Sequence, residues 1–313
     1  MRFLLDAEQA EFGRTLDRML GAADTPAAIR AWAGGDAGPG RALWGRLAEA
    51  GVFALAVPEP YEGVGPLTVE LAVSYVELGR HAVPGPVVET AAVAALLDGT
   101  GAAKEWLPRI AAGDVTVSLS GGRYALDADT ADAVFVADDD GTVRLAAGHG
   151  PLRASADPAR RLFVPDGDGE IVARGAKVRE AADLAALLTA AQSLGVGLEL
   201  LRRTVEYVRQ REQFGVPVGT FQAVKHRLAD ALVGLEFARP LLFGAALSMA
   251  SPDIAAAKLA TGEAAYATAR AALQLHGAVG YTEELDLSLW LRKARPLRDA
   301  WGTPAACRER VLG

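Results

Sequence analysis

The first third of the chain places hydrophobic side chains at the three- and four-residue spacing that is typical of helices. The first such pattern runs to Leu20 and starts behind Asp6, a residue type that often caps a helix. Comparable patterns predict further helices over residues 41–50, 67–80 and 86–97. Residues 22–40 are rich in Ala, Gly, Asp and Pro, so we expect part of that segment to be loop. Together these patterns predict an N-terminal helical domain over residues 1–110.

The pattern changes to short runs of β-type residues in the middle of the chain. Such runs occur at residues 115–119, 133–137, 143–145 and 162–164. Turn-forming sequences separate them, for example Asp-Asp-Asp-Gly at 138–141. We therefore expect a short middle β domain over residues 111–177, with antiparallel strands.

Long helical patterns return after residue 177. Residues 183–211 form one segment rich in Ala and Leu. Further helices are predicted to start near Phe221, at Ser251 and after Thr282. We expect Pro240 to kink or end the helix in which it lies. Residues 178–313 thus predict a four-helix bundle, and the whole chain is expected to be mostly α with a small central antiparallel β domain.

Composition narrows the function classes. Of the 313 residues, 51% are hydrophobic, which is enough for more than one core, and the net charge of -7 gives no reason to expect nucleic acid as a partner. No uninterrupted apolar stretch reaches the roughly 20 residues of a membrane helix, and the apolar run at residues 3–5 is too short for a signal peptide. Cys307 is the single cysteine, which excludes an intramolecular disulfide and fits a cytoplasmic protein.

Four short motifs occur in a fixed order along the chain. They are VPEPYEGVG at 57–65, REQFGVPVGTFQ at 211–222, QLHGAVGYT at 274–282 and RKAR at 292–295. This ordered set resembles the acyl-CoA dehydrogenase family, whose members carry VPEEYGGxG, RxxFGxPxxxFQ, QxxGGxGYT and RDAR. The resemblance extends over nearly the whole chain and implies that family's order of helical domain, β domain and helical bundle.

The resemblance also implies flavin adenine dinucleotide (FAD) bound at a subunit interface. Arg211 would pair with the pyrophosphate of a flavin held mainly by a neighbouring subunit, since a guanidinium grips phosphate oxygens through two parallel hydrogen bonds. Gln274 and Gly277 would approach the adenosine and the diphosphate, with no side chain at Gly277 to block the backbone. Cofactor contacts are likewise implied for Gln213, Phe214 and Gln222.

Simpler roles remain open for several of these residues. Arg211 could be an ordinary exposed cation at a helix end, and Phe214 could be a core residue. Gly277 could serve only as a helix C-cap.

The family's chemistry needs a carboxylate base beside the acyl α-carbon. Most members supply it as the Glu of a YEGT motif, but here residues 300–303 read AWGT and Trp301 takes the place of the Glu. Some relatives place the Glu about 26 residues before the RxxFG arginine, which falls on Ala185 here. Neither base position is filled, so no catalytic residue is predicted.

A relocated base remains an alternative. Asp183 lies two residues from Ala185, and Asp299 lies two residues from Trp301. Two residues along a helix point about 200° apart, so neither carboxylate should face the same site. We expect Asp183 to be a helix N-cap and Asp299 to be a solvated charge.

A second departure lies after the first β-strand. Family members carry a TEPxAGSD loop there that contacts flavin and substrate, whereas this chain reads SGGRY at 120–124. With both losses, the chain resembles the base-less β-type subunits of heterotetrameric (α2β2) bacterial acyl-CoA dehydrogenases that act on steroid side-chain CoA thioesters. That resemblance implies a homologous catalytic subunit as partner, an acyl-CoA substrate, FAD shared at the interface, and an electron-transfer flavoprotein as acceptor.

Two other functions stay open on the sequence alone. One is a self-sufficient acyl-CoA dehydrogenase with a relocated base. The other is a non-catalytic scaffold or acyl-CoA-binding protein of the same fold.

Overall fold

The computed structural model describes residues 4–313, so Met1 to Phe3, which include the start of the N-terminal apolar run, lie outside it. The N-terminal part is helical. Its helices are α1 (Ala7–Gly21), α2 (Thr25–Ala33), α3 (Gly38–Glu49), α4 (Thr68–Arg80), α5 (Val87–Leu97) and α6 (Ala103–Ala112). Asp6 caps α1 as predicted, because its carboxylate accepts the Gln9 amide at 2.8 Å. Part of residues 22–40 is loop, as expected, and between its loop stretches lies α2, which Asp24 caps and which has Pro26 in its first turn.

The middle part holds a four-stranded sheet of order β1-β3-β4-β6 and a separate pair, β2-β5. The strands are β1 (Val117–Ser120), β2 (Ala125–Leu126), β3 (Ala133–Ala137), β4 (Val143–Leu145), β5 (Leu162–Phe163) and β6 (Glu170–Ala173). Most pairs are antiparallel as expected, but β1 and β3 run parallel. The Asp132 carboxylate accepts the Thr116 amide at 2.8 Å, which holds the starts of β1 and β3 side by side. The β-type runs alone carry no information on strand direction.

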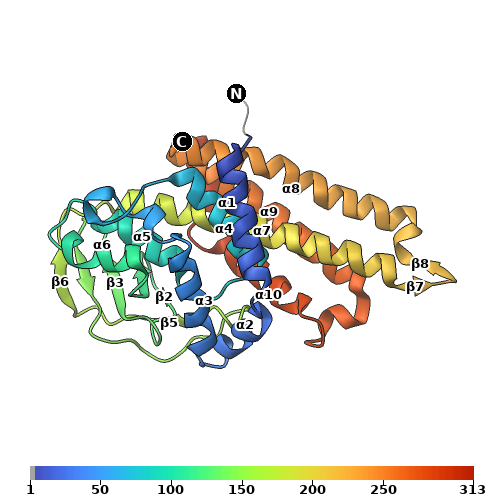
Figure 1. Cartoon of the computed structure of the whole chain (residues 1–313), viewed down its shortest axis with the longest axis horizontal. Helices are drawn as coiled ribbons and strands as arrows, with labels where there is room; N and C mark the ends of the chain where they lie inside the picture. The colour runs from blue at the N-terminus through green and yellow to red at the C-terminus, as the bar shows by residue number, and fades with distance from the viewer. Residues whose placement is uncertain (1–3) are drawn as a thin grey trace.

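The C-terminal part is a helical bundle with a small hairpin at one end (Figure 1). Its elements are α7 (Val178–Gln210), β7 (Glu212–Gln213), β8 (Val216–Pro217), α8 (Gln222–Ser248), α9 (Ser251–His276), α10 (Leu287–Asp299) and α11 (Pro304–Leu312). Pro240 does not end its helix, because α8 continues through it to Ser248. Glu236, whose carbonyl loses its helical partner to the proline, is exposed, so water can satisfy that oxygen.

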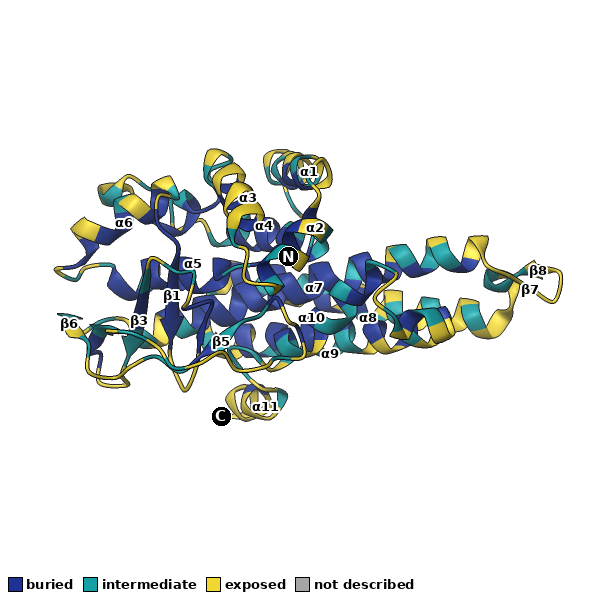
Figure 2. Ribbon diagram, turned by 90° about the horizontal axis from the view of Figure 1, so that it is seen from below, coloured by how far each residue is buried: buried dark blue, intermediate teal, exposed yellow. Residues whose placement is uncertain are grey.

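The predicted fold class is confirmed: helices, a small central sheet region and a helical bundle follow one another along the chain. Figure 2 shows the sheet region at one end of the molecule and the β7–β8 hairpin at the other, with α7 running between them. Helix α7 packs against α4, α5, α9 and α10, and most of its residues are buried.

Helices α4 and α7 cross at two glycines. A Cβ added at Gly195 of α7 would overlap the carbonyl oxygen of Val76, and one added at Gly79 of α4 would overlap that of Gln192. The backbones therefore approach so closely that only glycine fits at either position. This crossing fixes α7 against the N-terminal helices.

Two helices, α7 and α8, are long and apolar enough to cross a membrane by length and composition alone. The apolar window of α7 is 89% buried within the protein, as befits a core helix, whereas that of α8 is only 33% buried. The remaining apolar surface of α8 faces outward.

Substituting Gly195 by Ala is expected to lower the free energy of unfolding by about 2–3 kcal/mol, because the new methyl group forces α4 and α7 apart. The control is Gly45 in α3, where an added Cβ meets nothing within 4 Å. There Ala should stabilise the protein by about 0.5–1 kcal/mol through its higher helix propensity. Urea unfolding measures both, and equal stability of G195A and G45A would contradict the close crossing.

Candidate functional site

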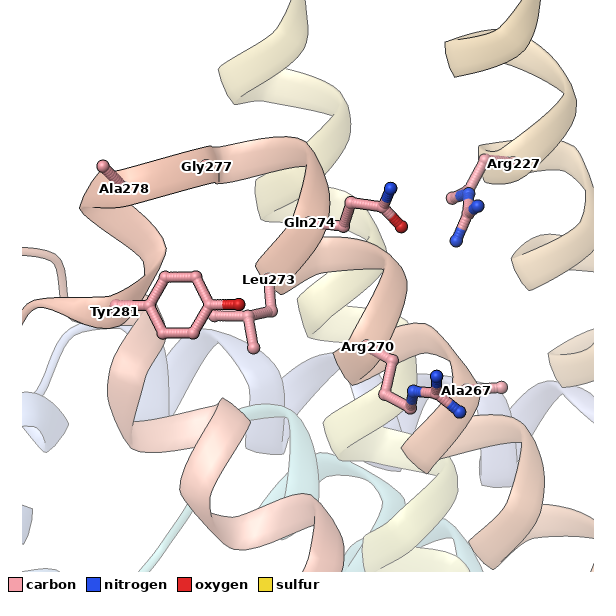
Figure 3. A pocket seen from close by; sticks show the side chains of 8 residues that line it. All are labelled: Arg227, Ala267, Arg270, Leu273, Gln274, Gly277, Ala278 and Tyr281. Carbon is pink, nitrogen blue, oxygen red and sulfur yellow. The ribbon is translucent and has the colours of Figure 1, made fainter.

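A groove of about 720 Å³ lies between α8 and α9. We call it the α8–α9 groove, and it is lined by Arg227, Ala267, Arg270, Leu273, Gln274, Gly277, Ala278 and Tyr281. Figure 3 shows the Arg227 guanidinium from α8 and the Gln274 amide from α9 pointing toward one another across it. Arg270 projects from α9 one turn before Gln274. No carboxylate lines the groove among the residues that the structure describes, so its polar groups are mainly donors.

The end of α9 shapes one wall of this groove. Gly277 ends the helix at φ 62° and ψ -139°, a conformation that disfavours any side chain. A Cβ there would meet nothing within 4 Å, so the backbone faces open space. Gly277 is thus a C-cap of α9, and its backbone is also open to the groove. The C-cap role and a cofactor contact are therefore compatible.

His276 anchors the same helix end to α7. Its ring stacks on Tyr207 with 4.1 Å between the ring centroids, and its Nδ1 lies 2.8 Å from the Ala272 carbonyl oxygen. Burial lowers the pKa of His276, which keeps the ring neutral at physiological pH. The groove wall is therefore held by a neutral, buried contact.

The other predicted cofactor residues lie at the β7–β8 hairpin and do not line the groove. Arg211 is the exposed C-cap of α7, and Gln213 is exposed on β7. Phe214 is 92% exposed at a φ of 55°, so it is not a core residue. Gln222, the first residue of α8, is exposed as well. Of the predicted cofactor residues, only Gln274 and Gly277 line the groove.

A second cavity, of about 670 Å³, is lined by Trp301, the residue that the motif resemblance aligns with the family's catalytic Glu. We call it the Trp301 pocket. Its lining comprises Glu89, Leu119, Gly121, Gly122, Arg123, Tyr124, Leu126, Ser155, Arg160, Leu162, Pro296, Asp299, Ala300, Trp301 and Thr303. The Trp301 indole donates its Nε1 hydrogen to the buried Glu89 carboxylate at 3.0 Å. A Cβ at Gly121 would lie 3.3 Å from the indole ring, so the loop after β1 closes tightly on it.

Lys258 of α9 holds the turn that carries Trp301. Its buried Nζ donates to the carbonyl oxygens of Leu297 at 3.0 Å, Arg298 at 2.8 Å and Gly302 at 3.3 Å. Burial lowers the pKa of Lys258 to about 8, so the ammonium still carries its charge at neutral pH. It satisfies the last carbonyls of α10 while Trp301 adopts a φ of 52°, which is rare for a bulky residue. Lys258 is therefore a positioning residue for the indole.

Of the two alternative bases, Asp183 lies away from this pocket. Helix α7 starts at Val178, so Asp183 is inside it and is not the predicted N-cap. Its carboxylate instead pairs with Arg310 at 3.0 Å and accepts from Ser251 at 3.3 Å. The Ala- and Leu-rich pattern predicted a helix that begins at Asp183, whereas residues 178–182 are also helical.

Asp299 is exposed, as expected, but it lines the Trp301 pocket, so the expectation that it faces away is wrong. The helical offset does not apply because α10 ends at Asp299 and the chain turns before Trp301. Glu89 is the buried carboxylate that sequence reasoning missed. Its signal was a single charge inside the otherwise apolar run of α5, which is costly to bury without a partner.

Comparisons with known proteins agree with the motif resemblance. Residues 6–114 match the acyl-CoA dehydrogenase N-terminal domain, and residues 175–312 match the C-terminal domain. The chain is 35% identical to acyl-CoA dehydrogenase IpdE2 of Mycobacterium tuberculosis over 86% of this chain and 85% of that protein.

Two solved structures share the fold. The ChsE4-ChsE5 complex from Mycobacterium tuberculosis is 25% identical, with a TM-score of 0.85 over 100% of this chain and 98% of that chain. The Tcur3481-Tcur3483 steroid ACAD is 24% identical, with a TM-score of 0.82 over 97% and 96% of the two chains, and at that identity it shows the fold alone.

Substituting Trp301 by Phe is expected to cost about 1–3 kcal/mol of unfolding free energy, because it leaves the buried Glu89 oxygen without its donor. The control is the same Trp301→Phe substitution made in a Glu89→Leu variant, which has no carboxylate to leave unpaired. There it should cost under about 0.5 kcal/mol of unfolding free energy. Urea unfolding of the four variants of this cycle gives the coupling. An equal cost of W301F in both backgrounds would show that the hydrogen bond contributes nothing.

Proposed function

The chain belongs to the acyl-CoA dehydrogenase family, and on that premise we propose that it is the base-less subunit of a heteromeric, FAD-dependent acyl-CoA dehydrogenase. The observation that carries the proposal is Trp301, which stands in the place of the catalytic Glu and is hydrogen-bonded to a buried carboxylate. An indole cannot take a proton from carbon at neutral pH, so in the proposed complex the base comes from a partner subunit.

The two cavities fit FAD unequally, which supports a shared cofactor. The α8–α9 groove offers two guanidiniums and an amide with no opposing carboxylate among the described residues, which suits a diphosphate. The Trp301 pocket suits the flavin ring poorly, because the indole lies against the loop after β1. We infer that this chain binds the adenosine half of a flavin whose ring the partner holds.

FAD, when bound, accepts a hydride from the acyl β-carbon while a base takes the α-proton, which gives an α,β-unsaturated thioester. In the proposed enzyme this chain performs neither step. Arg211, Gln274 and Gly277 orient the cofactor, and Trp301 supplies no base in this chain's own half-site. The proposed complex is therefore an oxidoreductase acting on CH–CH bonds, and the lone chain is inactive.

The outward face of α8 supports the proposed partner subunit. Its exposed apolar side chains are Leu232, Val233, Phe237, Leu241 and Leu247. A hollow of about 480 Å³ lies on the same face, lined by Pro240, Leu241 and Gly244 among others. An apolar stripe of this length on a helix is typical of a subunit interface. With the similarity to a two-component complex, it favours a homologous partner and an α2β2 assembly.

The acyl group is proposed to be a steroid side chain, on the strength of the resemblance to base-less subunits that serve such substrates. An electron-transfer flavoprotein as acceptor and a cytoplasmic location are proposed on the same ground.

One observation favours a second candidate function. Asp299 lines the Trp301 pocket, so it could act as a relocated base in a self-sufficient acyl-CoA dehydrogenase. In that case the lone chain would oxidise an acyl-CoA, and Asp299→Asn would abolish the turnover. The proposed base-less subunit shows no turnover alone, with or without that substitution.

Replacing Arg211 by Ala in the co-expressed complex is expected to weaken FAD binding about 10- to 100-fold, through loss of a charge-assisted contact to the pyrophosphate. The control is Arg209→Ala, which removes an exposed arginine two residues earlier on α7. Flavin content after gel filtration provides the measurement. If R211A and R209A retain equal flavin, Arg211 has no role at the cofactor.

Introducing aspartate at Phe237 and Leu241 should disrupt the proposed assembly, since it buries two charges in an apolar interface. Light scattering coupled to gel filtration should then show a smaller complex than the wild type. Leu152→Asp is the control, because Leu152 is also about half exposed but lies outside the bundle. An unchanged mass for F237D/L241D would place the partner on another surface.

A further inference from the structure

We propose that Asp17, Glu77 and His81 form a site for a divalent transition metal ion, with Zn²⁺ as the probe, between α1 and α4. The three side chains each offer one ligand atom, and these atoms lie within 4.8 Å of one another. Among residues 4–313, no other group of histidine, cysteine and acidic side chains comes together in this way. None of the three residues lines the α8–α9 groove or the Trp301 pocket, so the site is separate from the proposed flavin chemistry.

Two packed helices bring the ligands together. Glu77 lies in the last turn of α4 and His81 is the C-cap of that helix, so the two side chains are four residues apart and share one face. Asp17 comes from α1, which packs against α4 through the buried Leu16 and Leu20 (Figure 1). Side chains four residues apart on a helix can bind one metal ion, and a neighbouring element then supplies the third ligand.

The ligand atoms are close to the spacing of a metal centre. His81 Nε2 lies 2.8 Å from Asp17 Oδ1. A tetrahedral Zn²⁺ with bonds of about 2.1 Å holds its ligand atoms about 3.4 Å apart. The His81–Asp17 pair therefore has to open by about 0.6 Å, and Glu77 has to approach by at most about 1.4 Å. Side-chain rotation is enough for both adjustments.

The Glu77 carboxylate independently indicates a bound cation. Its Oε2 atom is buried and accepts no hydrogen bond within the described part of the chain. Arg80 Nε lies 3.4 Å from this oxygen, but the two atoms form no hydrogen bond, and Nε is itself unsatisfied. A buried carboxylate oxygen without a donor is costly, and direct coordination to a metal ion removes that cost. The Arg80 side chain is 30% exposed, so its guanidinium can turn toward solvent when a cation binds.

The donor set selects the class of ion. One imidazole nitrogen and two carboxylate oxygens suit Zn²⁺ and related first-row ions, whereas Ca²⁺ and Mg²⁺ prefer oxygen ligands alone. The two carboxylates also balance the charge of a divalent ion. Asp17 is 47% exposed while Glu77 and His81 are 15% and 16% exposed, so water can reach the ion from the side of α1 and complete its coordination. The ion fastens α1 to α4, which is a structural role.

The test measures Zn²⁺ binding by calorimetry, with the full chain purified without a histidine tag. The wild type should bind one ion per chain, and Zn²⁺ should raise its unfolding midpoint. Glu77→Gln and His81→Gln each remove a ligand. Each should weaken binding about 100-fold or more, because loss of a group that merely supports a ligand already costs about 10- to 100-fold. His226→Gln is the control, since His226 is an exposed histidine of α8 outside the three-ligand group, and its loss should leave the affinity unchanged.

Absence of Zn²⁺ binding by the wild type, or binding that E77Q and H81Q leave unchanged, overturns the inference. A loss in only one of these variants also overturns it, because the three ligands then do not act together. Circular dichroism in the presence of a chelator shows whether each variant is folded.

If E77Q or H81Q is unfolded, Asp17→Asn decides the matter. This half-exposed side chain keeps a hydrogen-bond acceptor for His81 and loses only its charge. A Zn²⁺ affinity that falls about 10-fold or more in D17N supports the site, and an unchanged affinity overturns it.

Discussion

The burial of α7 determines how the other elements of the chain are arranged around it. The apolar stretch of α7 needs another element against each of its faces, and α4, α5, α9 and α10 pack on this helix. The paired glycines at its crossing with α4 leave no freedom to slide. Because α7 reaches from the sheet region to the β7–β8 hairpin, its fixed axis sets the position of both ends of the molecule (Figure 2).

The α8–α9 groove and the Trp301 pocket differ in a way that accounts for the proposed sharing of the flavin site between subunits. In the Trp301 pocket, an indole and a buried carboxylate satisfy one another, and Lys258 secures the turn behind them. The α8–α9 groove is the reverse, with donors and positive charge that have no partner within the described chain. The indole and the carboxylate satisfy their hydrogen bond without a ligand, whereas no carboxylate lines the groove beside its arginines among the described residues. A subunit that lends contacts to a neighbour's cofactor would be expected to have this combination.

Local patterns in the sequence were enough to predict the order of the three parts and most of the helices. The Asp6 cap follows from a side chain that bonds the nearby backbone, and the helix start at Ser251 follows from Pro252 in the first turn. The parallel pairing of β1 with β3 and the contact between Glu89 and Trp301 did not follow, since each joins residues far apart in the chain. The sequence showed that Trp301 takes the place of the family's Glu, but it did not show that the indole bonds Glu89. Arg227 and Arg270 were missed because they lie outside the motifs and meet only when α8 packs on α9.

The flavin content of the purified chain shows whether this chain contributes to a flavin site that it does not complete. The chain would be expressed alone and with a homologous acyl-CoA dehydrogenase that carries the catalytic Glu. Visible absorbance of the flavin would be compared with the molar amount of each subunit. The account predicts a colourless, inactive lone chain and one FAD per pair of unlike subunits in an active complex. A lone chain that is yellow and oxidises an acyl-CoA would contradict it.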